Sequence, residues 1–337
     1  MDKLLSIIIS NRNDVAMLCV TVRSCIEEFQ SLNTDKCEVV ICDNSDDDIY
    51  KLVLSAIPSA YVRDKVVKIV RQPFPCLFTA RNRAIRESSG KYVLCLDSHM
   101  LCGHNSVKDL FDFMERREDD LTIGFAHAPI CWAHQHESRA RHDRDMKRSE
   151  LGPWGTAYDH ERTITWKGMP WICRRDWFLD RENGLGDYGA LSDHRVSWGG
   201  GDMHIGIKPW LLGFKNWAVP TRPFIHIGPF PGIDNDGKDS QHTQIAKDVK
   251  AQNRYRLYAK SGEFPHTFGF LVSCYVLGGE PMMKRNKKFL DEKFGRYLNT
   301  DKMWAKAISI GKDERARLVK RQVMTFDELL KREPWND

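Results

Sequence analysis

The sequence lacks several features that would assign it to a special class of protein. It contains no uncharged apolar run of the about 18 residues that a membrane-spanning helix needs. Its first residues, MDKLLSIIIS, lead directly into a predicted strand without the cleavage site of a signal peptide. It has no internal repeat and no low-complexity tract. These absences predict a soluble, cytoplasmic protein and argue against solenoid and disordered architectures.

The cysteines also lack a recognisable pattern. Ten are present, but they form no CxxC pair and no dense framework of the kind that staples small secreted domains. They are scattered through apolar runs, which favours reduced thiols in a core. What the chain does have is length and apolar content, with 337 residues of which 42% are hydrophobic. This is enough for one large domain with an appendage, or for two domains.

Positive charge is concentrated near the C-terminus. Residues 281–337 hold 15 Lys and Arg against 9 Asp and Glu, a larger surplus than the net charge of +5 for the entire chain. Such a region can attract phosphates, nucleic acid or an anionic surface, or it can form the solvated faces of ordinary helices. The composition changes where GPFPG is followed by IDNDGKDSQ. We therefore expect one domain over 1–230 and a basic, mainly helical region over 231–337.

The first hundred residues alternate β-rich runs with helical patterns. This order is typical of parallel strands joined by right-handed crossovers, so the predicted fold class is α/β, with a mainly parallel sheet flanked by helices. Polar clusters follow at least three of the strands, at the edge where open α/β sheets bind ligands. The predicted strands are 4–10, 38–42, 66–70, 92–96, 171–174 and 223–227, and the predicted helices are 14–30, 79–89 and 202–212.

Asp97 and His99 follow the predicted strand 92–96 directly. Two residues apart in extended backbone, their side chains lie on the same side and can reach one metal ion. A carboxylate with an imidazole suits Mn²⁺, and a divalent cation neutralises the charge that develops when a diphosphate leaves. Taken alone, the motif is also typical of an exposed turn after a strand, and that alternative stays open.

Two further elements contain residues that chemistry could use. The segment WGGGD at 198–202 combines glycines, which allow close approach to a ligand, with Asp202 at the start of a predicted helix. Asp202 could take a proton from an acceptor hydroxyl, or it could be an ordinary N-cap. His226, in the apolar run FIHIG, is either a core residue or a ligand.

The order of these motifs resembles a known family. The segments SIIISNRND, VVICDNSDDD, TARNRAIRESSGKYVLCLDSHM, GMPWICRRDWF, WGGGDMHIGIKPWLLG and FIHIG are similar to the glycosyltransferase A-type (Rossmann-like) fold, and most closely to the polypeptide N-acetylgalactosaminyltransferases. The resemblance covers roughly residues 3–230. It implies that 1–230 is the catalytic domain. It also implies that Asp97, His99 and His226 are the protein ligands of Mn²⁺ or Mg²⁺, whose remaining positions go to the diphosphate of a nucleotide sugar.

The resemblance also implies a nucleotide site. Asn11, Asp43 and Asn44 match positions where the family holds the base and ribose of a uridine diphosphate sugar. Asp97 matches a residue that contacts the same cofactor through the metal ion. The predicted helix that contains Arg81 and Asn82 matches one that faces the nucleotide. A guanidinium near a diphosphate is physically sensible, because its planar fork fits phosphate oxygens.

Substrate contacts follow from the same comparison. Trp198, Gly199 and Gly200 line the substrate in this resemblance, and Trp171 either stacks on the sugar or is a core residue. The chain departs from the family in one respect that affects stereochemistry. Asp202 is similar to the catalytic aspartate of inverting β-1,4-galactosyltransferases, whereas the Asp-Ser-His motif that ends in His99 is similar to the retaining enzymes. The sequence leaves retention or inversion open.

The leading hypothesis is a metal-dependent glycosyltransferase that moves a hexose or N-acetylhexosamine from a nucleotide diphosphate sugar, in the first instance UDP-linked, to an acceptor hydroxyl. The acceptor can be a glycan precursor, a protein or hydroxymethylated bases of modified DNA, which the basic C-terminal region would grip through phosphates. A non-catalytic sugar-binding module with the same fold is an alternative. A nucleotidyltransferase is disfavoured, because the loop SNRNDV has no glycine. The oligomeric state is left open.

Overall fold

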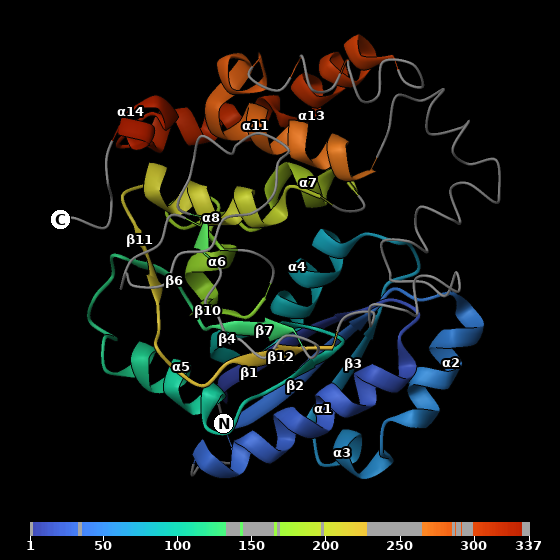
Figure 1. Ribbon diagram of the computed structural model, residues 1–337. Coiled ribbons are helices and arrows are strands. Elements are labelled where there is room, and N and C mark those ends of the chain that lie inside the picture. Colours follow the sequence, from blue (N-terminus) through green and yellow to red (C-terminus); the bar gives the residue numbers. More distant parts are fainter. Residues whose placement is uncertain are drawn as a thin grey trace.

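The computed structural model describes residues 3–32, 36–132, 142–143, 165–166, 169–196, 199–227, 265–284, 287, 291 and 299–331. Its central element is a seven-stranded sheet with helices on both faces (Figure 1). Strand β10 runs antiparallel to its neighbours and the other strand pairs are parallel, so the predicted mainly parallel α/β sheet is confirmed. In spatial order the strands are β11 (Lys215–Ala218), β6 (Ile123–His127), β10 (Trp171–Arg174), β4 (Gly90–Asp97), β1 (Lys3–Asn11), β2 (Cys37–Asp43) and β3 (Val67–Arg71).

Strands β1, β2 and β4 are buried on both faces. Ile7, Ile8 and Ile9 of β1 are completely buried, and so are Val39 and Val40 of β2. Consecutive side chains of a strand point to opposite faces, so a continuous apolar run is expected where helices cover both sides of a parallel sheet. The runs LLSIII and VVIC therefore encode strands in the interior of the sheet.

Helices cover both faces of the sheet. On one face lie α1 (Val15–Phe29), α2 (Asp47–Ala56), α3 (Ser59–Arg63) and α5 (Ser106–Glu115), and on the other lie α4 (Leu77–Glu87) and α6 (Arg175–Leu179) (Figure 1). The chain moves from β1 outward to β2 and β3, then crosses to β4 on the other side of β1. Ligands of open α/β sheets bind at such a reversal of strand order, at the carboxyl ends of the strands.

A small second sheet lies next to the end of β4. It consists of β5 (Met100–Leu101), β12 (Phe224–His226) and β7 (Ile130–Trp132), and β12 pairs with both of the others. His226 is opposite Met100, and the N–H of Ile227 donates to the carbonyl of His99 at 2.9 Å. The second sheet thus places β12 next to the end of β4. A two-stranded pair, β8 (His142–Asp143) with β9 (Thr165–Trp166), completes the described strands.

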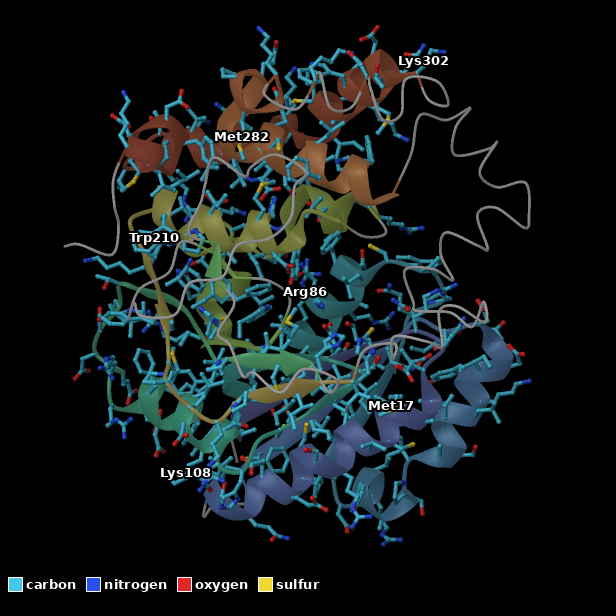
Figure 2. All side chains as sticks on the ribbon, viewed as in Figure 1. Met17, Arg86, Lys108, Trp210, Met282 and Lys302 are labelled. Carbon is cyan, nitrogen blue, oxygen red and sulfur yellow. The ribbon has the colours of Figure 1, made fainter. Side chains whose placement is uncertain are left out.

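The described part of the C-terminal region is helical, as predicted. Its helices α11 (Pro265–Lys284), α13 (Thr300–Arg321) and α14 (Phe326–Lys331) form a layer beyond α7 (Gly189–Asp193) and α8 (Gly201–Leu211) (Figure 1). Trp210 of α8 and Met282 of α11 are both buried side chains (Figure 2). The C-terminal helices therefore pack on the helix that begins in the WGGGD segment.

All ten cysteines are free thiols in the structure. Cys42 is among those in the core, and its burial raises the pKa of its thiol to about 12. Because the thiolate is the reactive form, such a residue is chemically inert. No helix among the described residues combines the length and the apolar character required to cross a bilayer.

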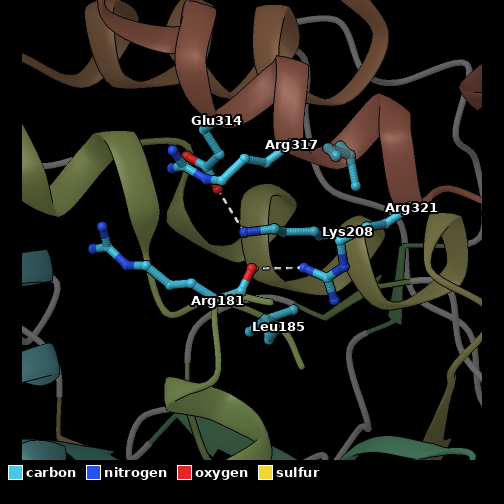
Figure 3. Close-up of a pocket in the computed structure, with 8 residues that line it drawn as sticks. Arg181, Leu185, Lys208, Glu314, Arg317 and Arg321 are labelled. Carbon is cyan, nitrogen blue, oxygen red and sulfur yellow. Dashed lines mark hydrogen bonds and ion pairs between the residues drawn. The ribbon is translucent and has the colours of Figure 1, made fainter. Parts of the chain in front are cut away.

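A buried carboxylate joins α13 to α7 and α8. The Oε1 atom of Glu314 accepts a hydrogen bond from Lys208 Nζ at 2.5 Å and lies 3.0 Å from His204 Nε2, while Oε2 accepts from the N–H of Ala190 at 2.5 Å. Burial alone would raise the pKa of the Glu314 carboxyl, but Lys208 and His204 outweigh it and hold that pKa well below its usual range. Figure 3 shows this ion pair beside a pocket where Arg321 donates to the carbonyl of Arg181 at 3.0 Å.

Removing one partner of the Glu314–Lys208 pair leaves the other charge buried without compensation. We expect Glu314→Ala to lower the free energy of unfolding by about 3–5 kcal/mol. The double variant Glu314→Leu with Lys208→Met leaves neither of these charges buried. Its free energy of unfolding should therefore fall by much less than the sum of the losses in the two single variants. Urea denaturation of all variants measures the difference. Additive losses would show that the two side chains do not stabilise one another.

The lowered pKa of Glu314 makes its contribution depend on pH. An unfolded glutamate titrates near about 4.3, and the folded pKa lies below that, so the stabilisation is complete above the unfolded pKa and is lost as pH falls through the folded one. We expect the difference in unfolding free energy between wild type and Glu314→Gln to be largest near neutral pH and to shrink below about pH 4. Urea curves at neutral and acidic pH test this, and a difference that grows on acidification would contradict it.

Candidate active site

The parallel register of three strands brings most of the predicted site residues to one edge of the sheet. Asn11 of β1 is opposite Asp43 of β2, and Ser10 of β1 is opposite Asp97 of β4. Because all three strands run in the same direction, their carboxyl ends meet at the reversal of strand order between β1 and β4. Residues from segments far apart in the sequence therefore lie at one edge of the sheet.

Asp97, His99 and His226 converge beside this edge. One ligand atom from each lies within 4.8 Å of the others, and all three residues are partly exposed. The Nε2 atoms of the two imidazoles are 3.2 Å apart, and His226 Nε2 lies 3.9 Å from Asp97 Oδ2. One carboxylate oxygen and two imidazole nitrogens that face a common point fit a divalent transition metal such as Mn²⁺. Asp97 and His99 come from the end of β4 and the turn after it, and His226 from β12.

A buried arginine holds Asp97 in place. Arg81 of α4 is 4% exposed and donates from Nη2 to Asp97 Oδ1 at 2.8 Å and from Nη1 to the hydroxyl of Tyr188 at 3.3 Å. Burial alone would raise the pKa of the Asp97 carboxyl, but Arg81, together with His99 and His226, lowers it below its usual value. Asp97 thus stays ionised, with Oδ1 on the guanidinium and Oδ2 toward the imidazoles.

The predicted nucleotide residues form a hydrogen-bonded group at the ends of β1 and β2. Asn11 Nδ2 donates to Asp43 Oδ2 at 2.6 Å, and the N–H of Ser45 donates to Asp43 Oδ1 at 3.1 Å. Arg71 of β3 forms an ion pair with Asp43 at 3.3 Å. Asn44 is also buried, and its carbonyl accepts from Arg12 at 2.7 Å. These contacts make the edge rigid and polar.

Asn82 differs from this group in its surroundings. It is completely buried in α4, and its Oδ1 accepts a hydrogen bond from the N–H of Tyr188 at 3.3 Å. Together, Arg81 and Asn82 connect α4 to the segment before α7 rather than standing open at this edge of the sheet. Their predicted contact with a nucleotide stays a prediction.

Asp202 lies in the first turn of α8, as the sequence predicted, and its carboxylate is close enough to Arg81 and Tyr188 to affect their pKa values. The helix begins after two glycines with left-handed backbone, Gly199 at φ 97° and Gly200 at φ 74°. Glycine adopts this conformation without strain, which explains the residue type at both positions. Trp198 lies outside the described residues, so its predicted substrate contact stays a prediction.

Trp171 has its ring in the core. It is 0% exposed, stacks on Phe178 at 5.5 Å between ring centroids and meets Phe125 edge-on at 5.0 Å. In this position the ring offers no open face to a sugar. Of the two roles that the sequence allowed, the observed burial corresponds to the core residue.

Three residues of this region were missed by sequence reasoning. Tyr188 supports Arg81 and Asn82, Glu314 fixes α8, and Asp14 contacts His99 Nδ1 at 3.2 Å. Tyr188 and Glu314 lie in segments without a recognisable motif. Asp14 did carry a signal, because an acidic residue before a helical pattern is typical of an N-cap, but that pattern indicates a different role. Burial alone would lower the pKa of His99, yet Asp14 and Asp97 raise it.

Comparison with known proteins is consistent with this geometry. Residues 6–166 match the family model described as glycosyl transferase family 2. This segment is therefore similar to that family. It contains β1, β2, β4 and the predicted metal ligands Asp97 and His99, whereas Asp202 and His226 follow it. The match supports the predicted class of enzyme, a glycosyltransferase. A search of curated proteins gave no match.

Similarity to the solved structure of GalNAc-T7 confirms the fold. GalNAc-T7, crystallised with UDP, GalNAc and Mn²⁺, is 17% identical with a TM-score of 0.58, and the match covers 88% of this chain and 57% of that one. The chain therefore spans little more than half the length of that relative. The mannosyltransferase PcManGT from Pyrobaculum calidifontis, crystallised with GDP-Man and Mn²⁺, is 15% identical with a TM-score of 0.47, covering 95% of this chain and 86% of that one. The domain has the glycosyltransferase A-type fold that the motifs predicted.

The glycines that bracket α8 offer a matched test of the WGGGD segment. A Cβ on Gly200 would come 2.6 Å from the carbonyl oxygen of Gly269 in α11, whereas one on Gly213 (φ 86°) would meet Val323 at an ordinary 3.4 Å. We expect Gly213→Ala to cost about 1–2 kcal/mol for the left-handed backbone and Gly200→Ala to cost clearly more, because the clash adds to it. Thermal unfolding of both variants measures this, and equal losses would refute the close packing of Gly200 on α11.

Proposed function

We propose that the protein is a metal-dependent glycosyltransferase that moves a hexose or N-acetylhexosamine from a UDP-linked sugar to an acceptor hydroxyl. The observation that carries the proposal is the convergence of Asp97, His99 and His226 at the carboxyl edge of a family 2 domain, where the fold binds its ligands. The whole activity, including its donor and its metal, is the proposal.

The three atoms proposed to bind the metal define what each of these residues does. Asp97 uses Oδ1 for Arg81, which leaves Oδ2 for the ion, and His99 and His226 contribute their Nε2 atoms. A bound Mn²⁺ or Mg²⁺ would neutralise the negative charge that develops on the departing nucleoside diphosphate. Arg81 keeps Asp97 ionised and oriented, so the carboxylate is ready to bind a cation without reorganisation.

The donor nucleotide is assigned to the adjacent strand ends. Asn11, Asp43 and Asn44 form a fixed polar surface that suits the hydroxyl and amide groups of a nucleoside. This surface and the metal ligands share the edge of the sheet where β1 and β4 end, so the base and the diphosphate of one molecule could occupy them together. The GalNAc-T7 structure holds UDP and Mn²⁺ on the same fold, which supports this choice of donor.

Asp202 is the proposed catalytic base. It lies at the N-terminal end of α8, near Arg81, and Arg81 in turn contacts Asp97. A carboxylate in this position can take the proton of an acceptor hydroxyl while the sugar is displaced in line, which inverts the anomeric centre. Transfer with retention needs no base on the opposite side of the sugar. The anomeric configuration of the product, read by NMR, therefore decides whether Asp202 acts as a base.

The contacts of the basic helix bear on the acceptor. Arg315 of α13 donates to the carbonyls of Tyr275 and Val276, and Arg321 donates to those of Arg181 and Gly184. Part of the positive charge is therefore used inside the protein. The exposed basic side chains in the described part of α13 are Lys302, Lys312 and Lys320. A glycan precursor or a protein is accordingly the favoured acceptor, and modified DNA is the alternative.

The metal site and the base can be separated by mutation. With UDP-sugars and Mn²⁺ but no acceptor, wild type should hydrolyse the donor slowly and show a raised melting temperature, by mass action. We expect His226→Ala to lose the metal-dependent part of that rise, because it removes one of three ligands. Asp202→Asn should keep the rise and lose transfer by at least about 100-fold. Differential scanning fluorimetry and UDP release report both quantities.

His104→Ala serves as the control for these variants, because His104 is an exposed histidine outside the cluster. It should behave as wild type in both assays. A His226→Ala protein with full metal dependence would refute the assigned ligands. A screen of acceptors by mass spectrometry then identifies the class, and binding to DNA that weakens steeply with salt would favour the nucleic-acid alternative.

A further inference from the structure

Asp14 occupies an N-cap position without acting as a cap. Helix α1 begins at Val15, and the Asp14 side chain makes no capping hydrogen bond to it. Its Oδ2 instead lies 3.2 Å from His99 Nδ1, with 28% of the Asp14 side chain and 17% of the His99 side chain exposed. The carboxylate is therefore directed at a side chain that the proposed function uses as a metal ligand.

This contact determines which nitrogen of His99 carries the hydrogen. An ionised carboxylate only accepts hydrogen bonds, so Nδ1 must be the donor. In the neutral imidazole the lone pair is then on Nε2, the atom that faces His226 Nε2 at 3.2 Å. Nε2 is thus presented in the state that a cation requires. Hydrogen bonds of this kind orient metal-binding histidines and raise their basicity.

The same helix also fixes the backbone on both sides of His99. Thr21 lies further along α1. Its Oγ1 donates to the carbonyl of Ser98 at 2.9 Å and accepts from the N–H of Met100 at 3.0 Å. Asp14 itself is held by the preceding residue, since the N–H of Asn13 donates to Ser45 Oγ at 2.7 Å. Ring and backbone of His99 are therefore both positioned from α1.

We propose that Asp14 is a positioning residue for His99, which fixes its Nδ1–H tautomer and the direction of its Nε2 lone pair toward the metal. The proposal rests on the metal site of the proposed function, but its structural part concerns the metal-free protein as well. In this role Asp14 acts through His99.

The first measurement reads the tautomer directly. In metal-free protein labelled with ¹⁵N-histidine, at about pH 8.5 where imidazoles are neutral, we expect His99 to be the Nδ1–H tautomer. The resonances are assigned by their loss in His99→Gln. Asp14→Ser retains a good N-cap residue but has no carboxylate, so the tautomer should shift toward Nε2–H. An unchanged tautomer in Asp14→Ser would overturn the proposal.

The second measurement is the affinity for Mn²⁺ alone, by isothermal titration calorimetry. Asp14→Ser should weaken binding by about 10- to 100-fold, and Asp14→Asn by less, because its amide oxygen still accepts the hydrogen bond. Asp46→Ser is the matched control, since Asp46 is the acidic N-cap residue of α2 and also makes no capping bond. It should bind as wild type.

The outcomes separate the two proposals. If wild type binds no Mn²⁺, the proposed function fails, and the tautomer measurement still decides whether Asp14 orients His99. If wild type binds Mn²⁺ and Asp14→Ser binds equally well, the positioning role fails while the metal site stands. A loss of metal-free melting temperature in Asp14→Ser beyond that of Asp46→Ser, with the tautomer unchanged, would assign Asp14 a purely structural role.

Discussion

The parallel pairing of β4, β1 and β2 in one register is the constraint on which the candidate active site depends. It places Asn11 opposite Asp43, and it places Asp97 opposite Ser10, one residue before the level of Asn11. A slip of one residue would turn every side chain of a strand to the other face of the sheet. The buried apolar runs that set the register therefore also determine to which face the polar side chains at the strand ends point. The apolar core thus determines where the polar residues at the strand ends lie, although none of the proposed metal ligands belongs to it.

Interior charges come in compensated groups, and these connect this edge of the sheet to distant parts of the chain. Arg81 neutralises Asp97 at the edge of the sheet, and Lys208 with His204 neutralises Glu314 between α8 and α13. Helix α8 is therefore attached to the C-terminal layer along its length, with Gly200 packed against α11 at its start. The position of Asp202 depends on a region that supplies none of the residues assigned to the reaction.

The parts of this arrangement that could be predicted from sequence are those with a local pattern. Apolar runs followed by polar residues gave the strands and their functional ends, and the DxH motif, the WGGGD segment and His226 could be connected through a family resemblance. Asp14, Tyr188 and Glu314 could not be found in this way, because their partners are distant in sequence and only tertiary packing brings them together. Trp171 illustrates the reverse case. An aromatic residue near a site has the same sequence pattern whether its ring faces a ligand or, as here, Phe178.

The cluster of Asp97, His99 and His226 joins the two sheets of the protein, since β12 belongs to the smaller one. The three side chains lie together only when β12 has paired with β5, a pairing between segments far apart along the chain. Long-range strand pairings of this kind form slowly, because the entropy of closing the intervening loop must be paid first. If the proposed cation binds there, it binds only the folded arrangement, so it would stabilise the pairing of β12 against partial opening of the small sheet.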